Sequence, residues 1–259
     1  MSWRQNTVRM ISEANSILRM FSGTKFGYRV LMYHSVGTDL KSDPLLIYSI
    51  KPGLFEDHMR ILSQHPDVDL VNFTDGTGET NKIELAVTFD DGYKDNLTTA
   101  APIMQKYGIP FTVFVTTSFL ASKDSLYMSR NELKELASCP GATIGAHGIT
   151  HTPLSECDDF TLMAELIDSK NSLEDLLGQS IITMGYPFGA VDRRVRNAVK
   201  EVGYQRAGCS RFDINGPERD PLLLCRSVIL AQDSERVFLQ KLRGDWDWYR
   251  WRDRDPLSI

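Results

Sequence analysis

Cysteine is scarce in this sequence, long apolar runs are missing, and neither sign of charge dominates. The four cysteines form no Cys-x-x-Cys pair, which excludes the common zinc-ribbon spacing and gives no disulfide framework. They are Cys139, Cys157, Cys209 and Cys225. No run of about 20 apolar residues occurs, so no segment is predicted to span a membrane. The net charge of −5 gives no reason to expect nucleic acid as a partner. Because the N-terminus has no secretory signal, we predict a cytoplasmic protein with reduced thiols.

The composition, with 42% hydrophobic and 24% charged residues, is that of an ordinary folded protein. We predict one domain over residues 1–259, with its core at about 28–230. Residues 1–25 are amphipathic and mildly basic, which predicts a helix packed on the domain or, alternatively, lying peripherally on the inner membrane face. The tail, 244–259, contains three of the four tryptophans. It either folds back on the domain, stacks on sugar rings or forms an oligomer interface.

Short β-rich runs alternate with helical patterns along most of the chain. The predicted strands are 28–33, 84–89, 111–115, 142–146, 182–186, 204–208 and 225–229. The predicted helices are 52–64, 96–107, 130–138, 158–177 and 193–202, and loops are predicted at 38–51 and 72–82. This alternation implies parallel strands in an α/β fold, and seven largely apolar strands suit a barrel covered by helices. Reacting groups in such folds lie at the carboxyl ends of the strands.

Two of these runs end in residues that bind metals. The run 84–89 is followed by Asp90 and Asp91, and the run 142–146 by His147 and, four residues later, His151. Taken alone, the aspartates indicate a turn or helix cap, and the histidines are as often surface or core residues. Together, two imidazoles and one carboxylate make a three-ligand site for zinc or a similar ion, with a position open for water. Asp90 is then placed to take a proton from that metal-bound water during amide or ester hydrolysis.

The same segments resemble the motifs of a known family. Val87–Tyr93 (VTFDDGY) and Gly145–Leu154 (GAHGITHTPL) look like the first two motifs of the polysaccharide deacetylases, the NodB-homology group or carbohydrate esterase family 4. Met184–Gly189 (MGYPFG) resembles the third motif. Val30–Val36 (VLMYHSV) resembles the opening strand of a branch with a Tyr-His-x-Val motif. The resemblance covers roughly residues 28–230 and implies a distorted (β/α)7 barrel.

The resemblance also implies roles for individual residues. Asp91, His147 and His151 would be the metal ligands, and Asp90 the base. The metal would be one divalent ion, with zinc first and cobalt, nickel or iron as alternatives. The backbone N–H of Phe188 would donate to the tetrahedral oxyanion. The substrate-binding and oxyanion-binding segment would then be Tyr186, Pro187 and Phe188.

The sequence departs from the family pattern in two places. The third motif usually begins with an arginine that pairs with the base, but this chain has Gly185 there, and Arg226 is our candidate substitute. The family's C-terminal histidine acid is also missing, because no histidine follows His151. His34, which ends the first predicted strand, is the replacement candidate, since an imidazole titrates near neutral pH. Alternatively, His34 only bonds a loop, and the metal-bound water or Asp90 returns the proton. His58 and His65 are predicted to be solvated.

These inferences lead to one main functional hypothesis. The protein is expected to remove an N-acetyl group from an amino sugar during the biosynthesis of a surface glycan such as O-antigen, capsule or exopolysaccharide. The substrate would be an N-acetylated sugar, a nucleotide sugar or a lipid-linked glycan. Deacylation of a non-sugar amide or ester at the same metal is the first alternative. A catalytically impaired glycan-binding protein is the second, although such a protein would have no use for Asp90.

Overall fold

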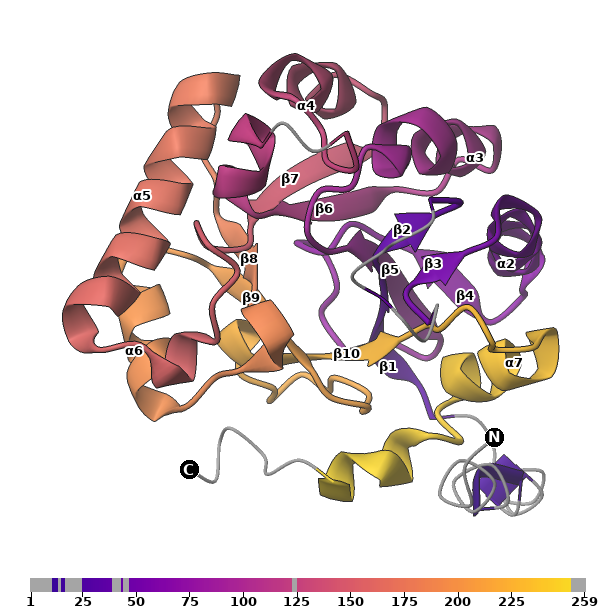
Figure 1. Ribbon diagram of the computed structural model, residues 1–259. Helices are drawn as coiled ribbons and strands as arrows, with labels where there is room; N and C mark the ends of the chain where they lie inside the picture. Colours follow the sequence, from indigo (N-terminus) through magenta and orange to yellow (C-terminus); the bar gives the residue numbers. More distant parts are fainter. Residues whose placement is uncertain are drawn as a thin grey trace.

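The computed structural model describes residues 11–13, 15–16, 25–38, 43, 47–122 and 125–252 (Figure 1). Of the predicted N-terminal helix, residues 11–13 and 15–16 are helical, and the rest of 1–24 lies outside the described residues. No helix of the described chain is both long and apolar enough to cross a membrane.

Seven parallel strands close into a barrel, as predicted. Going round the barrel, the strand order is β1, β5, β6, β7, β8, β9, β10, and β10 pairs again with β1. The strands are β1 (Gly27–Tyr33), β5 (Ile83–Phe89), β6 (Phe111–Val115), β7 (Ala142–Ala146), β8 (Thr183–Gly185), β9 (Arg206–Ser210) and β10 (Leu224–Val228). All seven residues of β1 pair with β5, and this contact closes the ring. The predicted fold class, a distorted (β/α)7 barrel, is therefore confirmed.

Three short strands were not predicted. β4 (Val68–Leu70) pairs with the first half of β5, on the edge that β6 uses further along. β2 (Ser35–Val36) and β3 (Ser49–Ile50) form a separate two-stranded sheet. Part of the predicted loop 38–51 is thus a strand. Segments of two or three residues are too short to show an alternating pattern, which explains why the sequence did not reveal them.

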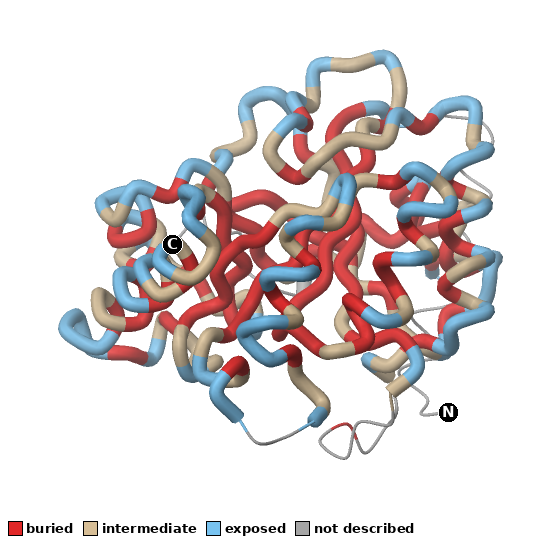
Figure 2. The backbone as a smooth tube through the Cα atoms, turned by 90° about the horizontal axis from the view of Figure 1, so that it is seen from above, coloured by how far each residue is buried: buried red, intermediate tan, exposed pale blue. Residues whose placement is uncertain are grey.

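Helices surround the barrel, and the buried strands lie inside them (Figure 2). They are α2 (Pro52–Gln64), α3 (Ala101–Lys106), α4 (Arg130–Ala137), α5 (Asp159–Leu177), α6 (Arg193–Glu201) and α7 (Glu235–Arg243). The predicted helix 96–107 begins as a π-helix, η1 (Asn96–Ala100), before α3. α4 begins at a capping box in which Ser129 and Glu132 each accept a backbone N–H of the other, and such a box stabilises a helix start. α7 was not predicted.

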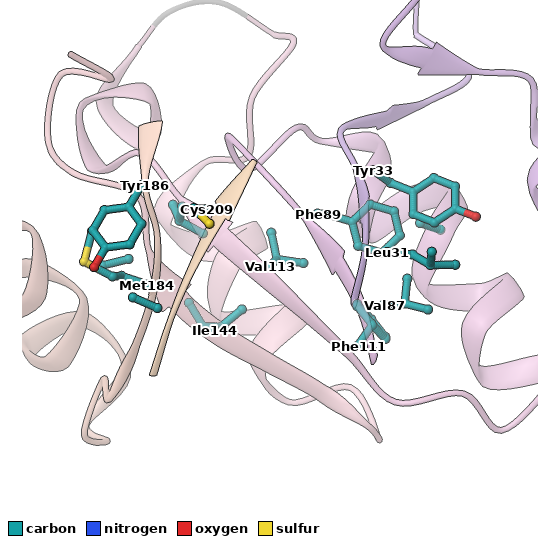
Figure 3. Packing of buried hydrophobic residues seen from close by; sticks show 14 of the residues in the cluster. Leu31, Tyr33, Val87, Phe89, Phe111, Val113, Ile144, Met184, Tyr186 and Cys209 are labelled. Atoms are coloured by element: carbon teal, nitrogen blue, oxygen red, sulfur yellow. The ribbon is translucent and has the colours of Figure 1, made fainter. Parts of the chain in front are cut away.

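The core has two layers, because successive residues of a strand face opposite sides. The outer layer packs the strands against the helices and contains Leu31, Val87, Val113 and Met184 (Figure 3). The barrel interior is a separate small cluster: Tyr28, Val30, Phe73, Ala86, Phe114 and Leu224. Beyond these apolar residues the interior becomes polar, with Arg226 donating to both Thr88 and Asp90. The polar part of the interior lies where β5 ends, and the site begins there.

His58 corrects the sequence prediction, because it is fully buried and not solvated. Its ring stacks on Phe238 of α7 with the centroids 3.9 Å apart, and its Nδ1 lies 3.2 Å from the Tyr33 hydroxyl. Because α7 was not predicted, the sequence offered no element that could cover His58 on α2.

The described part of the C-terminal tail folds back on the barrel. Trp246 is buried, and Lys241 lies over its ring, 5.2 Å from the centroid. Asp247 accepts two hydrogen bonds of 3.0 Å from the guanidinium of Arg29 in β1. Arg250 also donates to Asp213, at 2.9 Å. Up to this residue the tail therefore packs on the domain, which is the first of the three interpretations.

Candidate metal centre

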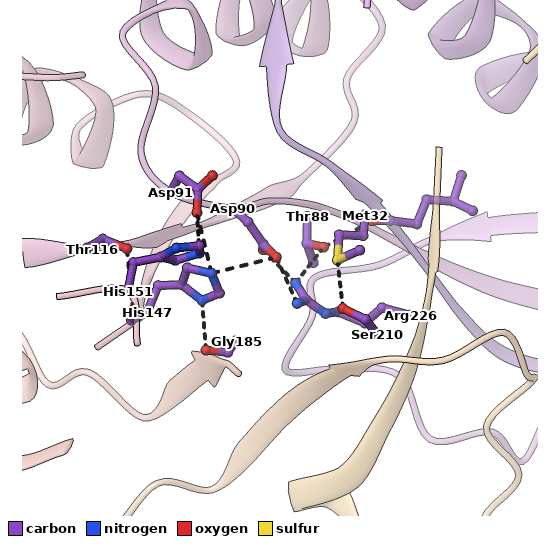
Figure 4. Close-up of polar contacts among 11 residues, drawn as sticks. Met32, Thr88, Asp90, Asp91, Thr116, His147, His151, Gly185, Ser210 and Arg226 are labelled. Carbon is purple, nitrogen blue, oxygen red and sulfur yellow. Dashed lines mark hydrogen bonds and ion pairs between the residues drawn. The ribbon is translucent and has the colours of Figure 1, made fainter. Parts of the chain in front are cut away.

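Three potential metal ligands converge at the carboxyl ends of β5 and β7. Oδ1 of Asp91 lies 3.1 Å from Nε2 of His151 and 3.5 Å from Nε2 of His147 (Figure 4). One ligand atom from each residue lies within 4.8 Å of the other two. The sequence therefore identified three residues that the fold brings together from segments more than fifty positions apart.

The chemistry of this donor set fits a divalent ion. Oδ1 of Asp91 is buried and has no hydrogen-bond partner of normal geometry, although two imidazole nitrogens face it. Nδ1 of His147 lies 2.8 Å from the carbonyl oxygen of Gly185, which can only accept a hydrogen bond. Nδ1 therefore carries the proton, and Nε2 presents its lone pair to the centre, as in metal-binding histidines. One carboxylate oxygen and two imidazole nitrogens suit zinc and similar ions.

The backbone around the centre is strained. Among the described residues, three that are not glycine have positive φ: Asp91 (74°), His151 (58°) and Phe188 (57°). All three are predicted site residues. Left-handed backbone is unfavourable for a bulky side chain such as phenylalanine, and such conformations persist where the surrounding structure enforces them. The fold thus holds these residues in place at a conformational cost.

Asp90 is a buried carboxylate paired with Arg226. Nη1 and Nη2 of Arg226 donate to Oδ1 and Oδ2 of Asp90 at 2.6 and 2.8 Å. Burial by itself raises the pKa of Asp90, but the charge and hydrogen bonds of Arg226, together with the charges of His147 and His34, outweigh it, and the pKa is lowered below the usual value. Asp90 is therefore ionised, as a base must be. Arg226 lies where we placed it from the sequence, and its contribution to turnover stays a prediction.

Glycine at position 208 makes the Arg226 contact sterically feasible. A Cβ atom on Gly208 of β9 would come within 2.5 Å of Cδ of Arg226. The guanidinium also lies over the ring of Phe114, 5.2 Å from its centroid. The arginine thus runs through the barrel interior in a channel that glycine leaves open.

His34 lies at the mouth of the barrel beside both carboxylates. Its positive charge, when protonated, lowers the pKa of Asp90 and of Asp91. Its Nδ1 is buried and has no hydrogen-bond partner, and its carbonyl accepts from Nδ2 of Asn96 at 2.8 Å. The imidazole packs against Tyr48 with the centroids 4.7 Å apart. His34 is thus near the reacting groups, and its role as acid stays a prediction.

The segment after β8 places Phe188, but not the Tyr186 side chain, beside the metal ligands. The Phe188 ring lies 4.5 Å from that of His151, and 65% of Phe188 is exposed. The Tyr186 side chain is instead buried in the outer core, where its hydroxyl donates to the carbonyl of Leu222 at 2.7 Å (Figure 3). Any contact of Tyr186 with substrate is therefore limited to its backbone.

Two buried acids beside the site escaped the sequence analysis. Glu165 of α5 accepts hydrogen bonds from the loop between the two histidines. Asp95 accepts from the Ser35 hydroxyl and the Thr38 N–H, and so ties the segment after His34 to the segment after Asp91. A charged residue on an apolar helix face was the available signal for Glu165, which lies between Leu162 and Leu166.

Comparisons with known proteins identify a family and several relatives. The model of the family "Polysaccharide deacetylase" matches residues 77–207, a little over half of the chain. YxkH of Bacillus subtilis (strain 168), which is named after the same family, is 29% identical over 184 residues, or 68% of this chain. The chain covers 62% of the length of YxkH. The poly-β-1,6-N-acetyl-D-glucosamine N-deacetylase of Staphylococcus aureus (strain MSSA476) is 25% identical over 222 residues, covering 80% of this chain and 74% of that protein.

A solved structure supports the fold. The Streptococcus pyogenes deacetylase PplD, solved in complex with acetate, superposes with a TM-score of 0.73 at 22% identity, covering 85% of this chain and 99% of that one. The enzyme class predicted from the sequence, a metal-dependent hydrolase, agrees with the family match and the Asp91, His147 and His151 cluster. The chain belongs to the polysaccharide deacetylase family.

Proposed function

We propose that this protein is a metal-dependent deacetylase that removes an N-acetyl group from an amino sugar of a surface glycan. The observation that carries the proposal is Asp90, a buried carboxylate that is paired with Arg226 and adjoins the cluster of Asp91, His147 and His151. A site that only bound a metal would not need a second buried carboxylate there. The family match and the Staphylococcus aureus relative, whose name specifies an N-acetylglucosamine polymer, support the substrate class.

The first steps of the hydrolysis use the metal ligands and Asp90. When bound by Asp91, His147 and His151, a divalent ion, with zinc our first candidate, supplies Lewis acidity that polarises the amide carbonyl and lowers the pKa of water. Asp90 takes the proton of the attacking water on a carboxylate lone pair that Arg226 leaves free.

The remaining steps use groups at the mouth of the barrel. The backbone N–H of Phe188 donates to the oxyanion that forms as water adds to the carbonyl carbon. The C–N bond then breaks, acetate forms, and His34 gives a proton to the leaving amine. Asp90 is the alternative source of that proton, because it holds the one taken from water.

Two exposed aromatic side chains at the mouth support a sugar substrate. Phe188 packs against His151, and Tyr48, which is 39% exposed, packs against His34. Flat apolar rings of this kind suit the faces of pyranose sugars. We further propose membership of the branch with the Tyr33-His34-Ser35-Val36 motif, and an N-acetylated polysaccharide, nucleotide sugar or lipid-linked glycan as substrate. Action at the cytoplasmic face, with residues 1–25 at the membrane, remains a prediction that fractionation of tagged protein would test.

An acetate-release assay tests the proposal. Metal-free protein would be reloaded with zinc, cobalt, nickel or iron(II) and given N-acetylated polysaccharides, nucleotide sugars and lipid-linked sugars, with non-sugar acetamides for comparison. We expect acetate from a sugar substrate only, and its loss on chelation. Asp90→Asn should keep the metal and lose turnover, whereas Asp91→Asn should lose the metal. A wild-type protein that binds no metal would refute the proposal, and an active Asp90→Asn variant would reassign the base.

A further inference from the structure

The four residues that run from His147 to Thr150 are held from two sides. On one side, the backbone N–H groups of Thr117 and Ser118 donate to the carbonyls of Gly148 and Ile149, at 3.1 and 3.0 Å. These carbonyls are therefore satisfied by the segment that follows β6. The N–H groups of Ile149 and Thr150 are instead bound from the other side, by α5.

Glu165 of α5 receives the donors on that side. Its Oε2 accepts from the N–H groups of Ile149 and Thr150 at 2.6 and 3.1 Å, and its Oε1 accepts from the Thr150 hydroxyl at 2.6 Å. Glu165 is only 4% exposed. Gly148 has a φ of 73°, and a Cβ atom on it would lie 2.8 Å from Oε2. The carboxylate and the loop therefore fit closely, and a side chain at position 148 would separate them.

We propose that Glu165 is a positioning residue that sets the separation of the two histidine ligands. This inference rests on the proposed metal site, because it concerns how His147 and His151 come to share one ion. His147 directly follows β7, and its Nδ1 is held by Gly185, so its ring is fixed by the barrel. His151 has left-handed backbone and a 23% exposed side chain, and the two N–H groups that Glu165 binds lie directly before it. Without that anchor, the N–H groups of Ile149 and Thr150 lose their acceptor, while the carbonyls of Gly148 and Ile149 keep their bonds to Thr117 and Ser118.

Two substitutions separate the hydrogen bonds of Glu165 from its charge. A glutamine could accept both N–H groups with its amide oxygen and donate its NH₂ to the Thr150 hydroxyl, so it would keep the loop in place without the charge. An alanine would leave both N–H groups without their acceptor. Removing residues that orient metal ligands typically costs about 10- to 100-fold in metal affinity.

The test measures zinc affinity by competition with a chromophoric chelator in the full-length protein. We expect Glu165→Ala to weaken zinc binding by about 10- to 100-fold and Glu165→Gln to remain within a few-fold of wild type. The absorption spectrum of the cobalt(II) form should change in Glu165→Ala and stay unchanged in Glu165→Gln. Ser169→Ala is the matched control, because Ser169 is equally buried on α5 but its hydroxyl bonds the carbonyls of Glu165 and Leu166.

The outcomes separate this inference from the proposed function. If the wild type binds no zinc, the proposed function fails. If the wild type binds zinc and a folded Glu165→Ala binds it equally well, only the positioning role is wrong. Where Glu165→Ala does not fold, Glu165→Asp keeps the charge but shortens the side chain by one methylene, which takes the carboxylate away from both N–H groups; an unchanged affinity and cobalt spectrum in that variant would overturn the inference.

Discussion

Replacing Arg226 with methionine should both destabilise the protein and abolish its activity. The guanidinium is buried and donates to both oxygens of Asp90, which is 3% exposed. Methionine fills much of the same space but cannot donate a hydrogen bond. The change therefore leaves an acid inside the barrel whose ionised form has lost its neutralising partner.

The expected magnitude follows from that burial. Breaking a buried ion pair by removing one partner costs about 3–5 kcal/mol, because the remaining charge is uncompensated. Since a typical domain has about 5–15 kcal/mol of stability, most of the variant should still fold under mild conditions. Adding Asp90→Asn removes the uncompensated charge, so Asp90→Asn/Arg226→Met should be more stable than Arg226→Met alone.

Urea denaturation of the metal-free proteins, together with acetate release by the metal-loaded ones, would check this prediction. Arg29→Met is the matched control, because it breaks a second buried bidentate pair, with Asp247, which takes no part in the site. We expect comparable destabilisation by both single variants, with activity per folded molecule lost only in Arg226→Met. A stability within about 1 kcal/mol of wild type, or an active Arg226→Met, would refute the reasoning.

Three further predictions concern single side chains. His34→Ala should lower kcat by about 100-fold or more while metal content stays unchanged, and a near-normal rate would leave Asp90 to return the proton. Phe188→Ala keeps the backbone N–H, so it should raise KM for polymeric substrate more than it lowers kcat; an unchanged KM would exclude sugar contact. Burial lowers the pKa of His58 from 6.5 to about 4, so the unfolded state binds a proton more readily. The free energy of unfolding should therefore fall by roughly 3 kcal/mol from pH 6.5 to 4, and urea titrations of His58→Gln should show a shallower fall.

The sequence predicted those parts of the fold whose pattern repeats along the chain. All seven barrel strands were located, and most of them are separated by recognisable helices. α7 was missed because no buried strand follows it to mark its end. The partner of His58, Phe238 of α7, was therefore missed as well. β2, β3 and β4 contain too few residues for a periodic signal.

At the site, the residues that follow strand ends were predictable, and those on helices were not. Asp91, His147 and His151 each follow a recognisable strand, so the parallel topology alone brings them to one end of the barrel. Glu165 lies in the second turn of α5, and its contact with the loop depends on how that helix packs against β7. An acid on the leucine face of α5 indicates a buried charge, but the sequence does not say which loop that charge contacts.

The position of the arginine shows how the interior constrains the site. The resemblance leads one to expect an arginine at position 185, where this chain has glycine. A Cβ atom on Gly185 would lie 3.0 Å from the Phe114 ring and 3.1 Å from Nδ1 of His147, so a long side chain there would displace one of them. On β9, by contrast, Gly208 leaves room for the side chain of Arg226. In this chain the Phe114 ring and His147 leave no room for a long side chain at position 185, whereas the glycine at 208 lets Arg226 reach Asp90 from β10.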